Sequence, residues 1–203
     1  MVTGDLRVCF VGDSFVAGTG DPEHLGWAGR VAARAHRAGQ ALTSYNLGVR
    51  RQTSRDILER WRVECTPRLP SGCDGRVVLS FGVNDTTIEE GRQRVAGADS
   101  ARHLCLLLRE ARSSGWPVLV VGPPPVADAE HNARTVVLSE WLQQVCRDEG
   151  APYVPTLPAL SSTPVWMQQV AAGDGAHPGA EGYAALAELV WPAWDAWCRP
   201  RLE

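Results

Sequence analysis

The chain has 203 residues, and its composition fits one globular domain, which we expect to span residues 1–203. Hydrophobic residues make up 44% and charged residues 21%, which excludes a disordered chain, a fibrous repeat and a coiled coil. A net charge of −3 argues against a dedicated nucleic-acid binder, because such proteins carry a basic excess. The sequence has no apolar run long enough to span a bilayer and no recognisable secretory leader. We therefore expect a cytosolic protein without an integral membrane segment.

Short apolar runs rich in Val, Leu and Phe alternate with longer segments of helical spacing. Such runs, bounded by turn residues, are typical of strands buried on both faces. The predicted strands are residues 6–11, 42–47, 76–81, 117–121 and 152–155. The predicted helices are residues 26–38, 54–63, 99–113, 135–149 and 179–197. Asp99 or Ser100 is expected to cap the third helix, and Pro192 to kink or end the last.

This alternation predicts an α/β fold, a three-layer α/β/α sandwich with a five-stranded parallel sheet. Right-handed crossovers leave few topologies, and we predict the flavodoxin-like strand order 2-1-3-4-5. In such sheets, ligands bind beyond the carboxyl ends of the strands. The functional residues are therefore expected directly after the strands.

Three predicted strands end in residue types that suit acyl transfer. The first runs into Gly12-Asp13-Ser14, where a serine hydroxyl at a strand-to-helix turn lies beside outward-pointing N–H groups. The third runs into Asn84, whose side chain donates hydrogen bonds without carrying charge. The second is followed by Gly48, where the backbone can approach a ligand closely. Taken singly, each segment is also consistent with an ordinary turn or helix cap.

Near the C-terminus, Asp174 stands three residues before His177, with small residues between them. This spacing lets the carboxylate hold one ring nitrogen of the histidine, which leaves the other nitrogen as a general base. A solvated or structural histidine is the alternative. Together the segments supply a nucleophile, oxyanion donors and an Asp/His pair, which is the set that acyl transfer requires.

In this order, the four segments resemble the blocks of the SGNH hydrolases, also called the GDSL esterase/lipase family, and small bacterial members in particular. Two departures stand out: Phe15 follows the serine where many members have leucine, and Arg50-Arg51 stand shortly after Gly48. The resemblance implies a serine esterase or lipase that cleaves a small-molecule carboxylic ester. It also implies that the reaction needs no metal and no organic cofactor.

The resemblance further assigns roles to five residues. Ser14 would attack the carbonyl, His177 would take and return the proton, and Asp174 would orient His177. The oxyanion would be bound by the N–H groups of Ser14 and Gly48 and by the Asn84 side chain.

Several alternatives stay open. The same site would serve a thioesterase or lysophospholipase, or a carbohydrate O-acetylesterase, and a flavodoxin-like module that binds a small anion is the non-enzymatic alternative. Arg50 and Arg51 suggest an anionic substrate, unless they lie in solvent or pair with nearby acids. His131, expected in the loop after the fourth strand, is a further candidate for substrate contact. The sequence leaves open a homodimer and whether Cys65 and Cys73 pair or stay free thiols.

Overall fold

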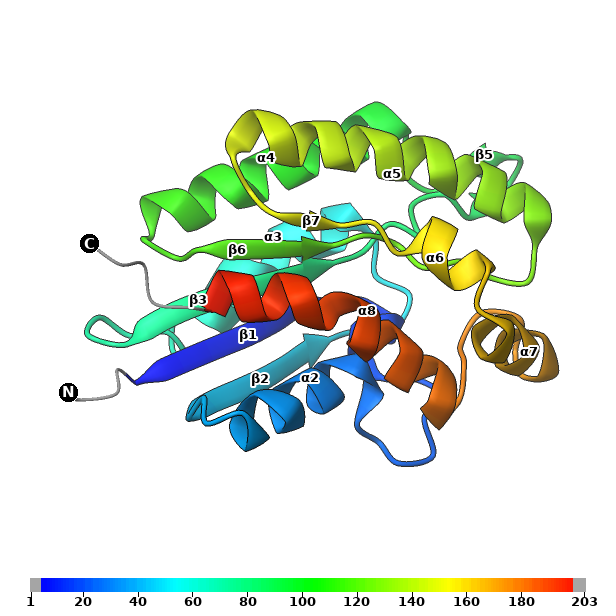
Figure 1. Cartoon of the computed structure of the whole chain (residues 1–203). Helices are drawn as coiled ribbons and strands as arrows, with labels where there is room; N and C mark the ends of the chain where they lie inside the picture. Colours follow the sequence, from blue (N-terminus) through cyan, green and yellow to red (C-terminus); the bar gives the residue numbers. More distant parts are fainter. Residues whose placement is uncertain (1–4, 199–203) are drawn as a thin grey trace.

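A parallel sheet of five strands forms the centre of the computed structural model, which describes residues 5–198 (Figure 1). The strands are β1 (Leu6–Gly12), β2 (Leu42–Gly48), β3 (Asp74–Ser80), β6 (Val118–Val121) and β7 (Tyr153–Val154). Their order is β2-β1-β3-β6-β7, which is the predicted order 2-1-3-4-5 when these strands alone are counted. In the register, Gly12 pairs with Gly48 on one side and with Ser80 on the other, so three strands end at one level. The predicted fold class is confirmed.

Helices cover both faces of this sheet (Figure 1). The longer ones are α2 (Gly26–Arg37), α3 (Ser54–Cys65), α4 (Gly97–Ser113), α5 (Ala129–Glu149) and α8 (Ala180–Cys198). Because side chains alternate between the faces of a strand, Phe10 of β1 packs with α2 and α8, whereas Val11 packs with α3, α4 and α5. Trp194 of α8 stacks on Phe10, with 5.5 Å between the ring centroids. An apolar core on each face therefore fixes the sheet.

Several helix boundaries differ from the predicted ones. Helix α5 begins at Ala129 instead of residue 135, because Asp128 caps it by accepting from the His131 N–H at 2.9 Å. Helix α4 begins at Gly97, so neither Asp99 nor Ser100 is its cap. Helix α8 continues through Pro192 to Cys198. Pro192 lies on the exposed side of α8, where the carbonyl that lacks its N–H partner can reach water.

Several short elements were not predicted. They are α1 (Ser14–Ala17), α6 (Leu157–Ser161), α7 (Pro164–Ala172) and a hairpin of β4 (Ile88–Glu89) and β5 (Arg92–Gln93). Each follows the carboxyl end of a strand: α1 follows β1, the hairpin follows β3, and α6 and α7 follow β7 (Figure 1). These elements therefore surround the end of the sheet where the functional residues are expected.

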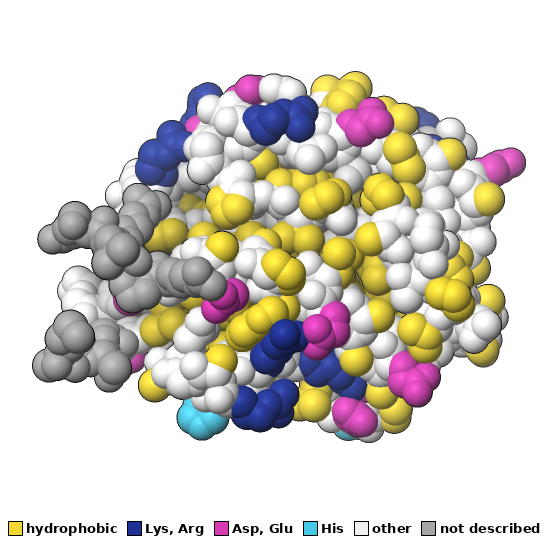
Figure 2. Space-filling view, viewed as in Figure 1, with side chains coloured by type: hydrophobic (Ala, Val, Ile, Leu, Met, Phe, Trp, Pro, Cys, Tyr) yellow, Lys and Arg dark blue, Asp and Glu magenta, His cyan; other side chains and the backbone are white. Residues whose placement is uncertain are grey.

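The surface carries mixed charge. On the face that carries α2 and α8, basic and acidic side chains lie among apolar ones (Figure 2), and Arg34 pairs there with Glu188 at 2.5 Å. The described part of the chain holds no helix that is both long and apolar enough to cross a membrane. All six cysteines are free thiols, Cys65 and Cys73 included.

Candidate active site

Ser14 is the first residue of α1, directly beyond the carboxyl end of β1. Asp13 caps this short helix, and its Oδ1 accepts from the Phe15 N–H at 3.0 Å. The Ser14 N–H belongs to the first turn and so has no acceptor within the helix. The strand-to-helix turn thus holds the hydroxyl and this N–H group at the predicted edge of the sheet.

His177 lies between α7 and α8 and contacts Ser14 at this edge. Its Nε2 is 2.8 Å from Ser14 Oγ, and its Nδ1 is 2.7 Å from Asp174 Oδ2. The other oxygen of Asp174 accepts from the N–H groups of Ala176 and His177 at 3.0 and 2.8 Å. The fold thus joins three residues from opposite ends of the chain in one line of contacts.

The charge of Asp174 determines which ring nitrogen of His177 carries hydrogen. Burial alone would raise the pKa of Asp174, but hydrogen bonds from His177 and Ala176 outweigh burial and lower this pKa to about 2. The carboxylate is therefore ionised at neutral pH and accepts a hydrogen bond from Nδ1. Nε2 then faces Ser14 with its lone pair, as a general base does.

Neighbouring groups also pack against His177. The Phe15 ring lies against it, with 4.8 Å between centroids, and Trp166 supports Phe15 from behind at 6.3 Å. Gly20 passes so close that an added Cβ would lie 3.2 Å from His177 Cβ. The imidazole is therefore confined by packing as well as by hydrogen bonds.

Asn84 lies beside Ser14, and its amide already has partners. Its Nδ2 donates to Gln52 O at 3.0 Å and to Asp13 Oδ2 at 3.3 Å. Asp13 is buried, and burial raises its pKa to about 7. Asp13 therefore supports both the start of α1 and the Asn84 side chain.

Gly48 has a packing role that its sequence position did not indicate. An added Cβ would lie 2.2 Å from Ala17 N, so only glycine lets α1 cross β2 here. The Gly48 N–H donates to Asn46 Oδ1 at 3.0 Å, and Asn46 Nδ2 donates to Val16 O at 2.7 Å. In this structure the Gly48 N–H is thus occupied by a neighbouring side chain.

Arg50 and Arg51 form the turn that follows β2, and both side chains are exposed. Arg51 has φ of 66°, in the left-handed region that favours glycine. Arg94 donates to Arg51 O at 2.8 Å, and the Arg51 guanidinium lies 3.3 Å from Glu89. The expected alternative for these arginines, pairing with nearby acids, holds for Arg51.

His131 does not lie in a loop, as expected, but in the first turn of α5. Its Nε2 lies 2.9 Å from Val83 O and 3.0 Å from Thr86 Oγ1. Burial lowers the pKa of His131, so the ring is neutral at neutral pH. His131 thus contacts the segment that carries Asn84.

A buried polar cluster beside Asn84 was missed by sequence reasoning. Asp85 accepts from the Ser54 N–H at 3.0 Å and from Ser100 Oγ at 2.7 Å, and Ser54 Oγ lies 2.8 Å from His103 Nδ1. The sequence carried no sign of this cluster, because its residues come from separate segments. Within residues 5–198, no group of three or more His, Cys, Asp or Glu side chains is arranged to hold a metal ion.

Comparisons with known proteins give the family of this chain. The model of the GDSL-like Lipase/Acylhydrolase family matches residues 10–185. The chain belongs to this family. It is therefore a hydrolase that acts on ester bonds, and the anion-binding module is set aside. The family match includes Ser14, Asn84 and His177.

Several solved structures share this fold. A lipase/acylhydrolase from Enterococcus faecalis has a TM-score of 0.79 and 22% identity, over 98% of this chain and 100% of that one. TesA has a TM-score of 0.78 and 24% identity, over 94% of this chain and 99% of that one. The acetylxylan esterase Axe2 from Geobacillus stearothermophilus has a TM-score of 0.77 and 19% identity, over 99% of this chain and 100% of that one. At these identities the likeness shows the fold alone. No match was found among the curated proteins.

Proposed function

We propose that the protein is a serine esterase that cleaves a carboxylic ester through an acyl-enzyme on Ser14. The observation that carries this proposal is the unbroken line of contacts from Asp174 through His177 to Ser14 Oγ, at 2.7 and 2.8 Å. Its ionised carboxylate and its confined imidazole suit proton transfer from the hydroxyl.

The reaction proceeds in two halves. Ser14 Oγ attacks the ester carbonyl while His177 Nε2 takes the hydroxyl proton, and the tetrahedral intermediate expels the alcohol, which receives that proton from His177. Water then attacks the acyl-enzyme with His177 again as base, and the acid leaves as Ser14 regains its proton. Asp174 holds the ring and stabilises its positive charge in both halves.

The oxyanion is bound by hydrogen-bond donors around Ser14. The Ser14 N–H has no acceptor in its helix, and Asn84 and Gly48 are the other expected donors. To donate to the oxyanion, the Gly48 N–H must leave Asn46 Oδ1, and one N–H of Asn84 must leave Gln52 O or Asp13. We infer that these two donors exchange partners when the ester binds.

The class of ester is a narrower question. A carboxylesterase is our first choice, and a carbohydrate O-acetylesterase is the second, favoured by the fold likeness to Axe2. A thioesterase or lysophospholipase would use the same residues. Three further expectations from the sequence stay predictions: a single domain over residues 1–203, no cofactor and a cytosolic location. Whether the protein forms a homodimer stays an open question.

Kinetics on a p-nitrophenyl ester series from acetate to palmitate test the proposal, with the variants Ser14→Ala and His177→Ala. Both variants should lower kcat by on the order of 10⁴–10⁶, as expected when a member of such a triad is lost. The exposed Ser113→Ala is the matched control and should keep its rate, and EDTA should have no effect. A Ser14→Ala protein that turns over like the wild type would refute the nucleophile.

A further inference from the structure

A charged hollow lies next to the active site, between the start of α3 and the β4–β5 hairpin. It has a volume of about 440 Å³, and it is lined by Thr53, Arg55 and Asp56 of α3 and by Glu89, Arg92 and Arg94 of the hairpin region. We call it the hairpin pocket. Three of these six side chains are guanidinium groups, in a chain whose net charge is −3.

The acidic side chains of the hairpin pocket already have partners. Asp56 Oδ2 accepts from both the N–H and the hydroxyl of Thr53 at 2.7 Å, which closes the capping box of α3. Glu89 lies 3.3 Å from Arg51 and 3.5 Å from Arg94. Thr53 is neutral, so Asp56 keeps its charge, and the two acids together offset part of the charge of the three arginines in the lining.

Arg55 and Arg92 are the other two arginines in this lining. Within residues 5–198, the side chain of neither one makes an ion pair or a hydrogen bond. Asp99 is the other acid close enough to sense Arg55, and it is already bound to Arg102 at 2.9 Å. Arg55 also lies in the first turn of α3, where the helix dipole disfavours a cation. An anion bound in the hairpin pocket would interact favourably with the positive N-terminal end of the α3 dipole. It would also reduce the electrostatic repulsion between the arginines.

The hairpin pocket is joined to Ser14 by the turn that follows β2. Arg94, in its wall, binds Arg51 O at 2.8 Å, and the next carbonyl, Gln52 O, accepts from Asn84 at 3.0 Å. Asn84 in turn contacts Asp13, the neighbour of Ser14. One turn of chain thus separates the hairpin pocket from the proposed oxyanion donors.

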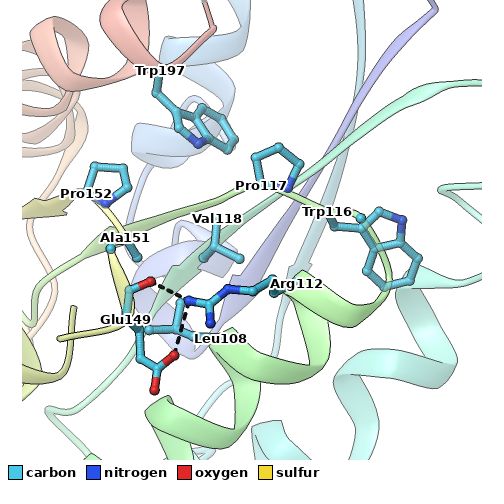
Figure 3. Close-up of a pocket in the computed structure, with 11 residues that line it drawn as sticks. Leu108, Arg112, Trp116, Pro117, Val118, Glu149, Ala151, Pro152 and Trp197 are labelled. Atoms are coloured by element: carbon cyan, nitrogen blue, oxygen red, sulfur yellow. Dashed lines mark hydrogen bonds and ion pairs between the residues drawn. The ribbon is translucent and has the colours of Figure 1, made fainter. Parts of the chain in front are cut away.

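A second hollow differs from the hairpin pocket in both its position and its charge. It has a volume of about 280 Å³ and lies beside Pro117 and Pro152, which precede β6 and β7, so it is at the opposite end of the sheet from Ser14 (Figure 3). Its arginine, Arg112, pairs with Glu149 at 3.1 Å. It therefore offers neither an unpaired cation nor access to the serine.

We propose that the hairpin pocket binds an anionic group of the ester substrate, a phosphate or a carboxylate, through Arg55 and Arg92. Guanidinium groups suit both anions, because their planar forks donate paired hydrogen bonds. The inference rests on the proposed esterase function and narrows its substrate to an ester that carries a negative charge beyond the scissile bond. The exposed Arg50 and Arg51 lie on the turn between the two places and add to the positive potential.

Steady-state kinetics of Arg55→Ala/Arg92→Ala test this proposal with three acetate esters: a neutral one, one with a phosphate on the alcohol and one with a carboxylate there. The variant should raise KM for at least one charged ester by tenfold or more relative to the neutral one, and which ester responds identifies the anion. Arg37→Ala/Arg62→Ala, with exposed arginines in the last turns of α2 and α3 that do not line the hairpin pocket, removes the same charge and should leave this ratio unchanged. Equal changes of KM for all three esters would overturn the proposal.

Binding of inorganic phosphate, followed by NMR titration of the backbone amides, separates this proposal from the esterase function. Shifts at residues 53–56 and 92–94 that disappear in Arg55→Ala/Arg92→Ala support the hairpin pocket, even if no ester is hydrolysed. Shifts that are unaffected by these substitutions overturn it, whatever the esterase rate.

Discussion

Asn84 depends for its position on residues from two other segments of the chain. Its amide is held by Gln52 O and Asp13, and its preceding carbonyl, Val83 O, lies 2.9 Å from His131 Nε2. Because a carbonyl only accepts, Nε2 carries the hydrogen in this contact. Arg134, one turn further along α5, donates to Thr86 O at 3.0 Å. We therefore interpret His131 as a positioning residue for the Asn84 segment.

Replacement of His131 tests this interpretation. His131→Leu should lower kcat about tenfold with little change in KM, because a displaced oxyanion donor weakens transition-state binding, and full loss of such a donor costs roughly 10²–10³. His131→Gln, whose amide can donate to Val83 O, should recover most of the rate. If His131→Gln and His131→Leu lower kcat equally, or if the substitutions change KM alone, His131 does not act through this hydrogen bond.

At the residue scale, the sequence indicates the chemical groups better than their partners. The contact of Ser14 and Asp174 with His177 could be predicted because these segments occur together in the expected order, although each alone also fits an ordinary turn or cap. Asn46 lies two residues before Gly48 in β2, and its contact with the Gly48 N–H is local. The partners of Asn84 could not be predicted, because Gln52 and Asp13 reach it only after β1, β2 and β3 align. Arg55 and Arg92 are likewise brought together by the fold alone.

At the element scale, the site depends on how closely α1 approaches β2. Ala17 of α1 lies over Gly48, where an added Cβ would be 2.2 Å from the Ala17 nitrogen. The turn that starts at Val49 is anchored there as well, because the Val49 N–H donates to Gly12 O at 3.0 Å. A shift of either element would move Ser14 relative to Asn84.

Gly48→Ala tests this close approach. It should lower the free energy of unfolding by about 1–3 kcal/mol, the usual cost of forcing extra volume into a packed place. Gly29→Ala in α2 is the matched control, since its new methyl group would meet only the Leu25 side chain, at 3.3 Å, and alanine favours helix. Urea denaturation measures both, and a Gly48→Ala protein as stable as Gly29→Ala would contradict the packing argument.

The elements that could be predicted are those with a clear apolar period. The strands β1, β3 and β6 are buried as expected, whereas β2, at the edge of the sheet, is largely exposed. The helices over the sheet show apolar stripes. The first turns of α5 were missed because His131, Arg134 and Thr135 face the polar Asn84 segment rather than the core. Helix α8 ends within one residue of its predicted end, and Pro192 does not end it because Pro192 lies on the exposed side, while Trp194 keeps the last turns in the core.

At the scale of the whole molecule, the sheet and its two apolar cores bring residues 14 and 177 into contact. The order β2-β1-β3-β6-β7 places β1 at the centre of the three strands whose ends meet at Ser14. The short elements that follow the strands then supply Asp174, His177 and the wall of the hairpin pocket. The sequence pattern predicts the sheet, whereas the shape of this rim depends on contacts between segments far apart in the chain.

The most direct test of the central claim is covalent labelling of Ser14 by a fluorophosphonate, read by mass spectrometry. Ser14 Oγ displaces fluoride from phosphorus only when it is activated as a nucleophile, so we predict one label per chain, on the peptide that contains Ser14. Ser14→Ala should take no label, and His177→Ala should be labelled far more slowly. Ester hydrolysis by a protein that takes no label at Ser14, or takes it on another residue, would contradict the account.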